Sequence, residues 1–204
     1  MVARVLRFTA LRVLDDRRVL LLDGHARRLG EGSREALLEF ASSAEPGVYR
    51  ANWDGARLVT EVRGPSRLSE GMPSRFVSSP VADQRGRFPK PGPPSPYDAV
   101  RLAGVATLLT DARGEEIFEE SASAVLAWDG ASLVITPESS PAVASVAEDA
   151  VLRALDVKRA RILVGDAWPL VLINAVAGVV GISVEGRGPF PAEVRAKVAA
   201  VLTE

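Results

Sequence analysis

Hydrophobic positions alternate with polar ones in some segments of the chain and recur at helical spacing in others. Residues 2–22 carry two apolar runs on either side of an Asp-Asp pair, which predicts two antiparallel strands joined by a turn. Asp23 is expected to cap a short helix that ends near Leu29, and a second helix is predicted from Ser33 to Ser43. The chain therefore opens with a predicted strand pair followed by two helices.

The clearest hairpin signal comes next. The apolar runs GVYRANW and ARLVTEVRG flank Asp54 and Gly55, a dipeptide that supplies the positive φ angles of a tight hairpin turn. Residues 74–79 form one further predicted strand.

A proline-rich segment then interrupts the pattern. The stretch GRFPKPGPPSP, residues 86–96, contains five prolines and two glycines. Proline lacks an amide donor and restricts the residue before it, so this stretch cannot continue a helix or a central strand. We predict a domain boundary here, with an N-terminal α+β domain at residues 1–85, an interdomain linker at 86–96, and a β-rich C-terminal domain with helices at 97–204.

Beyond the linker, strand-like and helical patterns are mixed. Residues 97–104 and 144–155 have helical spacing, and Pro191 is expected to begin a final amphipathic helix. Strands are predicted for VATLLT, ASAVLAW, SLVITP, ARILV, PLVLIN and GVVGISV. This order of elements is typical of an α+β fold rather than a doubly wound α/β fold.

Composition excludes several classes of function. Lys plus Arg (25) nearly balances Asp plus Glu (26), so neither nucleic acid nor an anionic membrane surface is an expected partner. The longest apolar run, near residues 170–180, is too short to span a bilayer, and no signal peptide is recognised, so a cytoplasmic location is expected. The absence of cysteine and the single histidine, His25, leave little material for a metal site, and none is predicted.

Several stretches with candidate chemistry follow one another along the chain. They are FTALRV with the H-x-x-R-L motif of LLLDGHARRL, Lys90, Glu119 in EIFEESASAVLAWDG, the predicted helix start at residues 145–148, and LVLINAVAGVVGI. In this order they resemble the class IV aminotransferase and aminodeoxychorismate lyase family, whose members are fold-type IV pyridoxal-phosphate (PLP) proteins. The resemblance covers nearly the whole chain. It implies the two-domain fold of D-amino-acid aminotransferase, with a pseudo-barrel as the second domain, and PLP as cofactor.

The resemblance assigns the two basic residues of the site. Arg28 stands where the family binds the cofactor phosphate, and a guanidinium group offers a planar fork to that dianion. Lys90 resembles the Schiff-base lysine and is the candidate catalytic residue. Lysine reacts with the PLP aldehyde only when neutral, so burial and a nearby cation such as Arg28 would have to depress its pKa. Taken alone, Arg28 could equally be a surface residue, and Lys90 a linker residue between two prolines.

The remaining cofactor contacts are also assigned by resemblance. Glu119 stands where a glutamate pairs with the pyridine nitrogen and so keeps the ring protonated. Val146 and Ala147 occupy the helix start that binds phosphate, although Ala147 lacks the hydroxyl of the family's threonine, and a glutamate follows it. Asn174 and Ala175 belong to a turn whose small residues let the backbone approach the phosphate.

The resemblance implies a PLP-dependent lyase or transaminase that acts on an amino acid or on aminodeoxychorismate, as a homodimer. Arg63 is a candidate for binding the substrate carboxylate. The alternative is a non-catalytic relative that has lost PLP and acts as a structural or binding protein, because Lys90 lies between prolines and Ala124 and Ala147 replace polar residues of the family. A hydrolase built on Ser121 or Ser123 with His25 rests on residue types alone.

Overall fold

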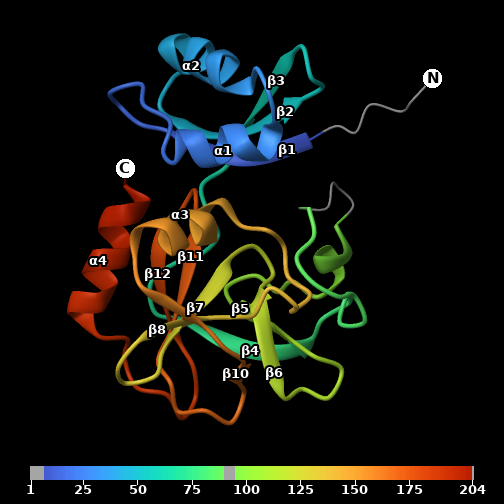
Figure 1. The fold of residues 1–204 in the computed structure, drawn as a ribbon, viewed down its shortest axis with the longest axis vertical. Coiled ribbons are helices and arrows are strands. Elements are labelled where there is room, and N and C mark those ends of the chain that lie inside the picture. Colours follow the sequence, from blue (N-terminus) through green and yellow to red (C-terminus); the bar gives the residue numbers. More distant parts are fainter. Residues whose placement is uncertain (1–6, 90–94, 204) are drawn as a thin grey trace.

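The computed structural model describes residues 7–89 and 95–203, which form two sheets with helices packed against each (Figure 1). The upper unit in Figure 1 has a three-stranded sheet in the order β1-β2-β3, and the lower unit has a nine-stranded sheet in the order β10-β6-β5-β4-β12-β11-β7-β8-β9. Mixed sheets with helices confirm the predicted α+β class. None of the helices in these residues is long and apolar enough to cross a membrane.

The small unit consists of β1 (Arg7–Val13), α1 (Leu22–Leu29), α2 (Ser33–Ser43), β2 (Gly47–Trp53) and β3 (Leu58–Arg63). The predicted β2–β3 hairpin is confirmed, with antiparallel pairing from Val48 opposite Arg63 to Trp53 opposite Leu58. Gly55 has a φ of 95°, the left-handed conformation that the turn requires.

The strand pair predicted at residues 2–22 is wrong. β1 pairs along its whole length with β2, and Val19 makes only an isolated bridge to Val13. Val19 and Leu20 are instead buried, and Leu21 forms the N-cap of α1, so Asp23 lies in the first helical turn rather than at the cap. Alternating apolar residues identify a strand but not its partner, because either neighbour can satisfy the same pattern.

The two faces of the small sheet have different neighbours. Leu11 of β1 and Ala51 of β2 are fully buried, in the same cluster as Leu29 and Leu37 of the two helices. Because successive side chains of a strand point to opposite faces, the alternate residues of β1 and β2 lie on the face away from those helices. This second face carries Arg50 and is part of the cavity described below.

The large unit contains the other strands and two helices. These are β4 (Met72–Ser78), β5 (Ala106–Thr110), β6 (Glu116–Glu120), β7 (Ala124–Trp128), β8 (Leu133–Ile135), β9 (Val157–Arg159), β10 (Ile162–Leu163), β11 (Leu170–Asn174), β12 (Gly178–Ser183), α3 (Val146–Ala154) and α4 (Ala192–Leu202). The chain crosses between the sheets at residues 64–71, because β4 pairs in parallel with β5 and β12 of the large sheet. The division into two domains at a proline-rich linker, with a pseudo-barrel as the second domain, stays a prediction.

Both faces of the central strands are covered. Leu126 of β7 and Val171 of β11 pack in the cluster that contains α3 and α4, whereas Val125 and Leu172 pack in the cluster on the opposite face. Strands buried on both sides read as continuous apolar runs, which is why β7, β8 and β11 were recognised from the sequence.

Three expectations for the large unit were less accurate. The helix expected at residues 97–104 is only a 3-10 turn, η1 (Pro96–Ala99), and ARILV contributes only the two residues of β10. β6 has the sequence EIFEE and was not expected to be a strand. Glutamate is uncommon in strands, but tertiary contacts bury Glu119 and Glu120 and override that local preference.

Candidate functional site

A cavity of about 390 Å³ lies where the two units meet, a size within the usual range of small-molecule sites. The small unit contributes the second face of its sheet and one residue of α1, and the large unit contributes the β6–β7 turn, the start of α3 and the β11–β12 turn. The polar side chains that line the cavity are Arg28, Arg50, Arg63, Ser66, Arg67, Ser95, Tyr97, Asp98, Arg101, Glu119, Glu120, Ser121, Ser123, Ser145 and Asn174.

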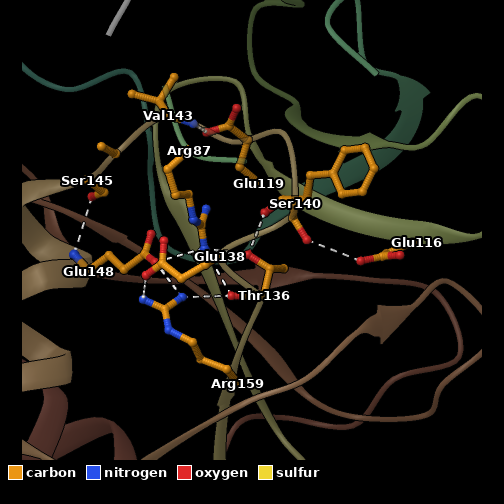
Figure 2. A network of polar contacts seen from close by, with 12 residues as sticks. Arg87, Glu116, Glu119, Thr136, Glu138, Ser140, Val143, Ser145, Glu148 and Arg159 are labelled. Carbon is orange, nitrogen blue, oxygen red and sulfur yellow. Dashed lines mark hydrogen bonds and ion pairs between the residues drawn. The ribbon is translucent and has the colours of Figure 1, made fainter. Parts of the chain in front are cut away.

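Glu119 is a buried carboxyl group in the wall of this cavity. It is only 4% exposed, and its two oxygens accept hydrogen bonds from the Tyr97 hydroxyl (2.6 Å) and the Val143 amide (2.9 Å). Figure 2 shows Glu119 beside Val143. No ion pair joins Glu119 to any residue in the described part of the chain. Burial raises the pKa of Glu119 to about 7, partly offset by these two hydrogen bonds and by the more distant charge of Arg87.

Tyr97 determines how the Glu119 carboxyl is held. The tyrosine is 2% exposed, and it sits in η1, which the Ser95 and Asp98 side chains cap reciprocally. Burial and the neighbouring Glu119 carboxylate both raise the pKa of Tyr97, so the phenol stays protonated and acts as a donor.

The substitution Tyr97→Phe tests the hydrogen bond between Tyr97 and Glu119. We expect Tyr97→Phe to raise the pKa of Glu119 above about 7, because the phenol hydrogen bond favours the ionised carboxylate. The measurement is the pH titration of the Glu119 carboxyl carbon by NMR. Tyr49→Phe is the matched control, since the Tyr49 hydroxyl donates to the Glu45 carbonyl in the small unit. An unchanged titration of Glu119 in Tyr97→Phe would contradict the assignment.

Arg28 lies at the N-terminus of α3. Its guanidinium donates to the Ala144 carbonyl, one residue before the N-cap Ser145, and burial lowers the pKa of Arg28. The first N–H groups of an α-helix have no partner within the helix and carry partial positive charge. A guanidinium beside such a terminus is a well-suited site for a phosphate group.

The packing of α1 against α3 sets this arrangement. A Cβ added at Gly24 would lie 2.7 Å from Cγ1 of Val146, so only glycine permits the close approach of the two helices. An ion pair between Arg27 and Asp149, at 2.6 Å, also joins them. The glycine of the sequence LDGHARRL therefore helps to bring Arg28 to the start of α3.

Glu148, which follows the two expected phosphate-binding residues, points away from the cavity. It is 4% exposed, and its carboxylate lies 2.8 Å from the Arg87 guanidinium and 3.4 Å from that of Arg159. Figure 2 shows the cluster, in which Arg87 also donates to the carbonyl and hydroxyl of Thr136. Glu148 therefore fixes α3 to the segments that carry Arg87 and Arg159. Because its charge is paired with these arginines and faces away from the cavity, it does not repel an anion at the N-terminus of α3.

Asn174 connects two turns that face the cavity. Its amide nitrogen donates to the Ala122 carbonyl (2.7 Å), and its amide oxygen accepts from the Val176 amide (2.8 Å). Asn174 thus orients the turn that follows Glu119 and the turn that contains Ala175.

The structure brings most of the residues predicted from the sequence together. Five of the six expected cofactor contacts line the cavity, namely Arg28, Glu119, Val146, Asn174 and Ala175. Ala147 does not line it: its side chain is fully buried in the core beneath α3, so only its backbone could serve a ligand. Lys90 lies outside the described residues.

The structure does not support the hypothesis of a hydrolase in which His25 acts as the base for Ser121 or Ser123. His25 is fully buried, and its Nδ1 lies 2.7 Å from the hydroxyl of Thr9. His25 is not among the residues that line the cavity, whereas Ser121 and Ser123 are. The serines and the histidine therefore do not form one site.

Sequence reasoning missed Tyr97, Arg50, Arg67 and Arg101 as cavity residues. The run Ser95-Pro96-Tyr97-Asp98 has a helix-capping signature that could have indicated an ordered turn. No local pattern, however, indicates that these side chains face Glu119 or a shared cavity.

No family model matches the sequence, and no curated protein matches it. Solved structures do match. A putative 4-amino-4-deoxychorismate lyase has a TM-score of 0.70 at 21% identity, over 98% of this chain and 91% of that chain. The 4-amino-4-deoxychorismate lyase from Pseudomonas aeruginosa has a TM-score of 0.69 at 16% identity, over 96% and 88%. This chain has the fold of the fold-type IV PLP enzymes. A hypothetical aminotransferase from Mycobacterium tuberculosis in a PLP-bound form is also similar, with a TM-score of 0.64 at 18% identity, over 99% and 90%.

The resemblance predicted from the ordered motifs is thus confirmed at the level of the fold-type IV fold. The matches cover almost the whole of this chain and about nine tenths of each of these three structures.

Proposed function

We propose that this chain is a PLP-dependent protein of the class IV aminotransferase type, acting as an aminodeoxychorismate lyase or an amino-acid aminotransferase. The observation that carries the proposal is Glu119, a buried carboxyl group in the cavity wall that has two neutral donors and no ion pair among the described residues. Buried carboxylates are normally paired with a cation. The protonated pyridine nitrogen of PLP would be such a cation.

Arg28 and the start of α3 support a binding site for the phosphate group of PLP. Arg28 and the start of α3 together offer a positive charge and the backbone amides of Val146 and Ala147, which have no partner within the helix. The hydroxyl that Ala147 lacks would cost one hydrogen bond to a charged group, about 1.5 to 3 kcal/mol. That loss weakens phosphate binding without removing the site.

The proposed covalent anchor is Lys90. Lys158 and Lys197, the two lysines that the structure describes, do not line the cavity. Phe88 lies next to the cavity wall, since its carbonyl accepts from the amide of Ala144 at 2.9 Å, and Val143 and Ser145 on either side of Ala144 line the cavity.

Bound PLP would accept electrons from the substrate Cα. The Nζ of Lys90 is the proposed base and acid that moves the Cα proton. Glu119 would hold the proton on the ring nitrogen, Arg28 and α3 would fix the phosphate, and Asn174 would orient the adjoining turns. The expected homodimer and cytoplasmic location stay predictions.

Chemical trapping tests this proposal. The purified protein is incubated with PLP, reduced with borohydride, digested, and analysed by peptide mass spectrometry. We expect a visible absorbance band before reduction and a pyridoxyl group on Lys90 after it, and Lys90→Ala should lose both. Lys158→Ala is the control, because Lys158 is exposed and pairs with Asp129 at 3.7 Å. The absence of both band and modification from the unaltered protein would reject PLP binding and favour the non-catalytic alternative.

A further inference from the structure

Residues 142–144 contact Glu119 and Arg28 at the same time. The Val143 amide donates to the Glu119 carboxylate at 2.9 Å, and the carbonyl of the next residue, Ala144, accepts from the Arg28 guanidinium. A small displacement of this segment would therefore change the contacts of both proposed cofactor-binding residues.

Phe88 lies beside this segment in a short parallel ladder. The Phe88 amide donates to the Ala142 carbonyl at 3.1 Å, and the Phe88 carbonyl accepts from the Ala144 amide at 2.9 Å. Val143 lies opposite Phe88, so the Val143 amide points to the other side of the ladder, where it donates to Glu119. The position of Phe88 thus determines the direction of the Val143 amide.

Arg87, the residue before Phe88, fixes this ladder to two elements of the large unit. Its Nη2 atom lies 2.8 Å from the Glu148 carboxylate and donates to the carbonyl (3.1 Å) and hydroxyl (2.8 Å) of Thr136, as Figure 2 shows. Thr136 directly follows β8, and Glu148 lies in the first turn of α3. These contacts are largely buried, and polar contacts in such surroundings are stronger than in water.

Arg87 also acts on Glu119 through its charge. Burial raises the pKa of Glu119 to about 7, the charge of Arg87 lowers that pKa, and the charge of Glu148 raises it. The third ionisable side chain that acts on Glu119 is Tyr97 of η1, which stays protonated. Arg87 and Glu148 therefore have opposite electrostatic effects on the same carboxyl group, although they form one ion pair.

We propose that Arg87 is a positioning residue for Glu119, because it fixes the ladder that directs the Val143 amide toward the Glu119 carboxylate. This inference deepens the proposed function and rests on it for the role of Glu119 in binding PLP. The positioning itself is a property of the protein without PLP, and it can be tested in that form.

The test follows the Glu119 carboxyl carbon by NMR through a pH titration of PLP-free protein, together with hydrogen exchange at the Val143 amide. Arg87→Lys keeps the charge on a side chain that is one bond shorter, so it cannot keep all three contacts of Nη2. We expect faster exchange at Val143 and a Glu119 midpoint raised by roughly 0.5 to 1 pH unit, about half the value of a hydrogen bond to a charged group. Arg87→Gln also removes the charge and should raise the midpoint further.

Glu148→Gln tests the sign of the effect. It removes the other charge of the pair while Arg87 keeps its bonds to Thr136, so it should lower the Glu119 midpoint. Destabilisation alone does not produce opposite shifts from the two partners of one ion pair.

Arg187→Lys is the matched control. The Arg187 guanidinium also donates to three backbone carbonyls and does not line the cavity; the carbonyls are those of Leu163, Val164 and Trp168. This variant should leave the Glu119 midpoint and the exchange of the Val143 amide unchanged.

The inference is overturned if folded Arg87→Lys titrates and exchanges as the unaltered protein does, or if Arg187→Lys causes the same shift. If Arg87→Gln does not fold, the opposite shifts expected for Arg87→Lys and Glu148→Gln still decide the question. Shifted titration without a pyridoxyl group on Lys90 would reject the proposed function and retain the positioning role of Arg87. Modified Lys90 with an unshifted titration would do the reverse.

Discussion

Glu119→Gln is expected to stabilise the PLP-free protein at pH 8 and to remove most of the affinity for PLP that we propose. The pKa of Glu119 is raised from 4.5 to about 7, so the folded state holds the proton more tightly than the unfolded state does. Its contribution to stability is therefore full below pH 4.5 and is lost as the pH rises through 7. A shift of this size corresponds to about 3 kcal/mol. A neutral glutamine avoids that loss.

The glutamine side chain also fits the existing contacts. Its oxygen can accept from the Val143 amide, and its NH₂ group can donate to the Tyr97 hydroxyl oxygen. The measurement is urea unfolding at pH 4.5 and pH 8. We expect a gain of about 3 kcal/mol at pH 8 and under about 1 kcal/mol at pH 4.5.

Glu115→Gln, on the exposed β5–β6 turn, controls for the loss of one negative charge. The proposed PLP binding, followed by absorbance, should fall because a neutral amide cannot form an ion pair with a protonated ring nitrogen. Opposite changes in stability and PLP affinity are the signature of a residue kept for a ligand. A purely structural Glu119 would show a loss of stability at both pH values.

Arg87→Ala is expected to lower the free energy of unfolding by about 3 to 5 kcal/mol. The Arg87 and Glu148 side chains are only 11% and 6% exposed, and the substitution leaves a buried carboxylate with Arg159 alone, at 3.4 Å. Burial already raises the pKa of Glu148, and losing Arg87 raises it further. The hydrogen bonds from Arg87 to Thr136 are lost as well. The cost is measured by urea unfolding at pH 7.

Two companion variants sharpen this result. Adding Glu148→Gln to Arg87→Ala should recover part of the lost stability, because the unpaired charge is then gone. Arg153→Ala removes an exposed ion pair with Asp149 on the same helix and should cost only about 0.3 to 0.5 kcal/mol. A cost below about 1 kcal/mol for Arg87→Ala would show that water or Arg159 compensates the carboxylate.

The resemblance of the ordered motifs to the class IV family named Arg28, Glu119 and Asn174 as candidate site residues. Each motif alone is too short to assign a role, so the assignment depends on their order along the chain. The sequence did not predict the direction of Glu148, which depends on Arg87 and Arg159 from two other segments. It also did not predict that Ala147 packs into the core, because a helix start does not show which side of the helix is covered.

The sequence by itself determined the α+β class, the hairpin at Asp54 and Gly55, and the order of motifs that resembles the fold-type IV proteins. Each of these depends on neighbouring residues or on their order along the chain. Only the tertiary structure decided that β1 pairs with β2, that Tyr97 holds Glu119 from 22 residues away, and that Arg28 meets the start of α3 across 116 residues. Such contacts depend on how whole elements pack, here through the close approach at Gly24, and packing between distant segments leaves no periodic signal in the sequence.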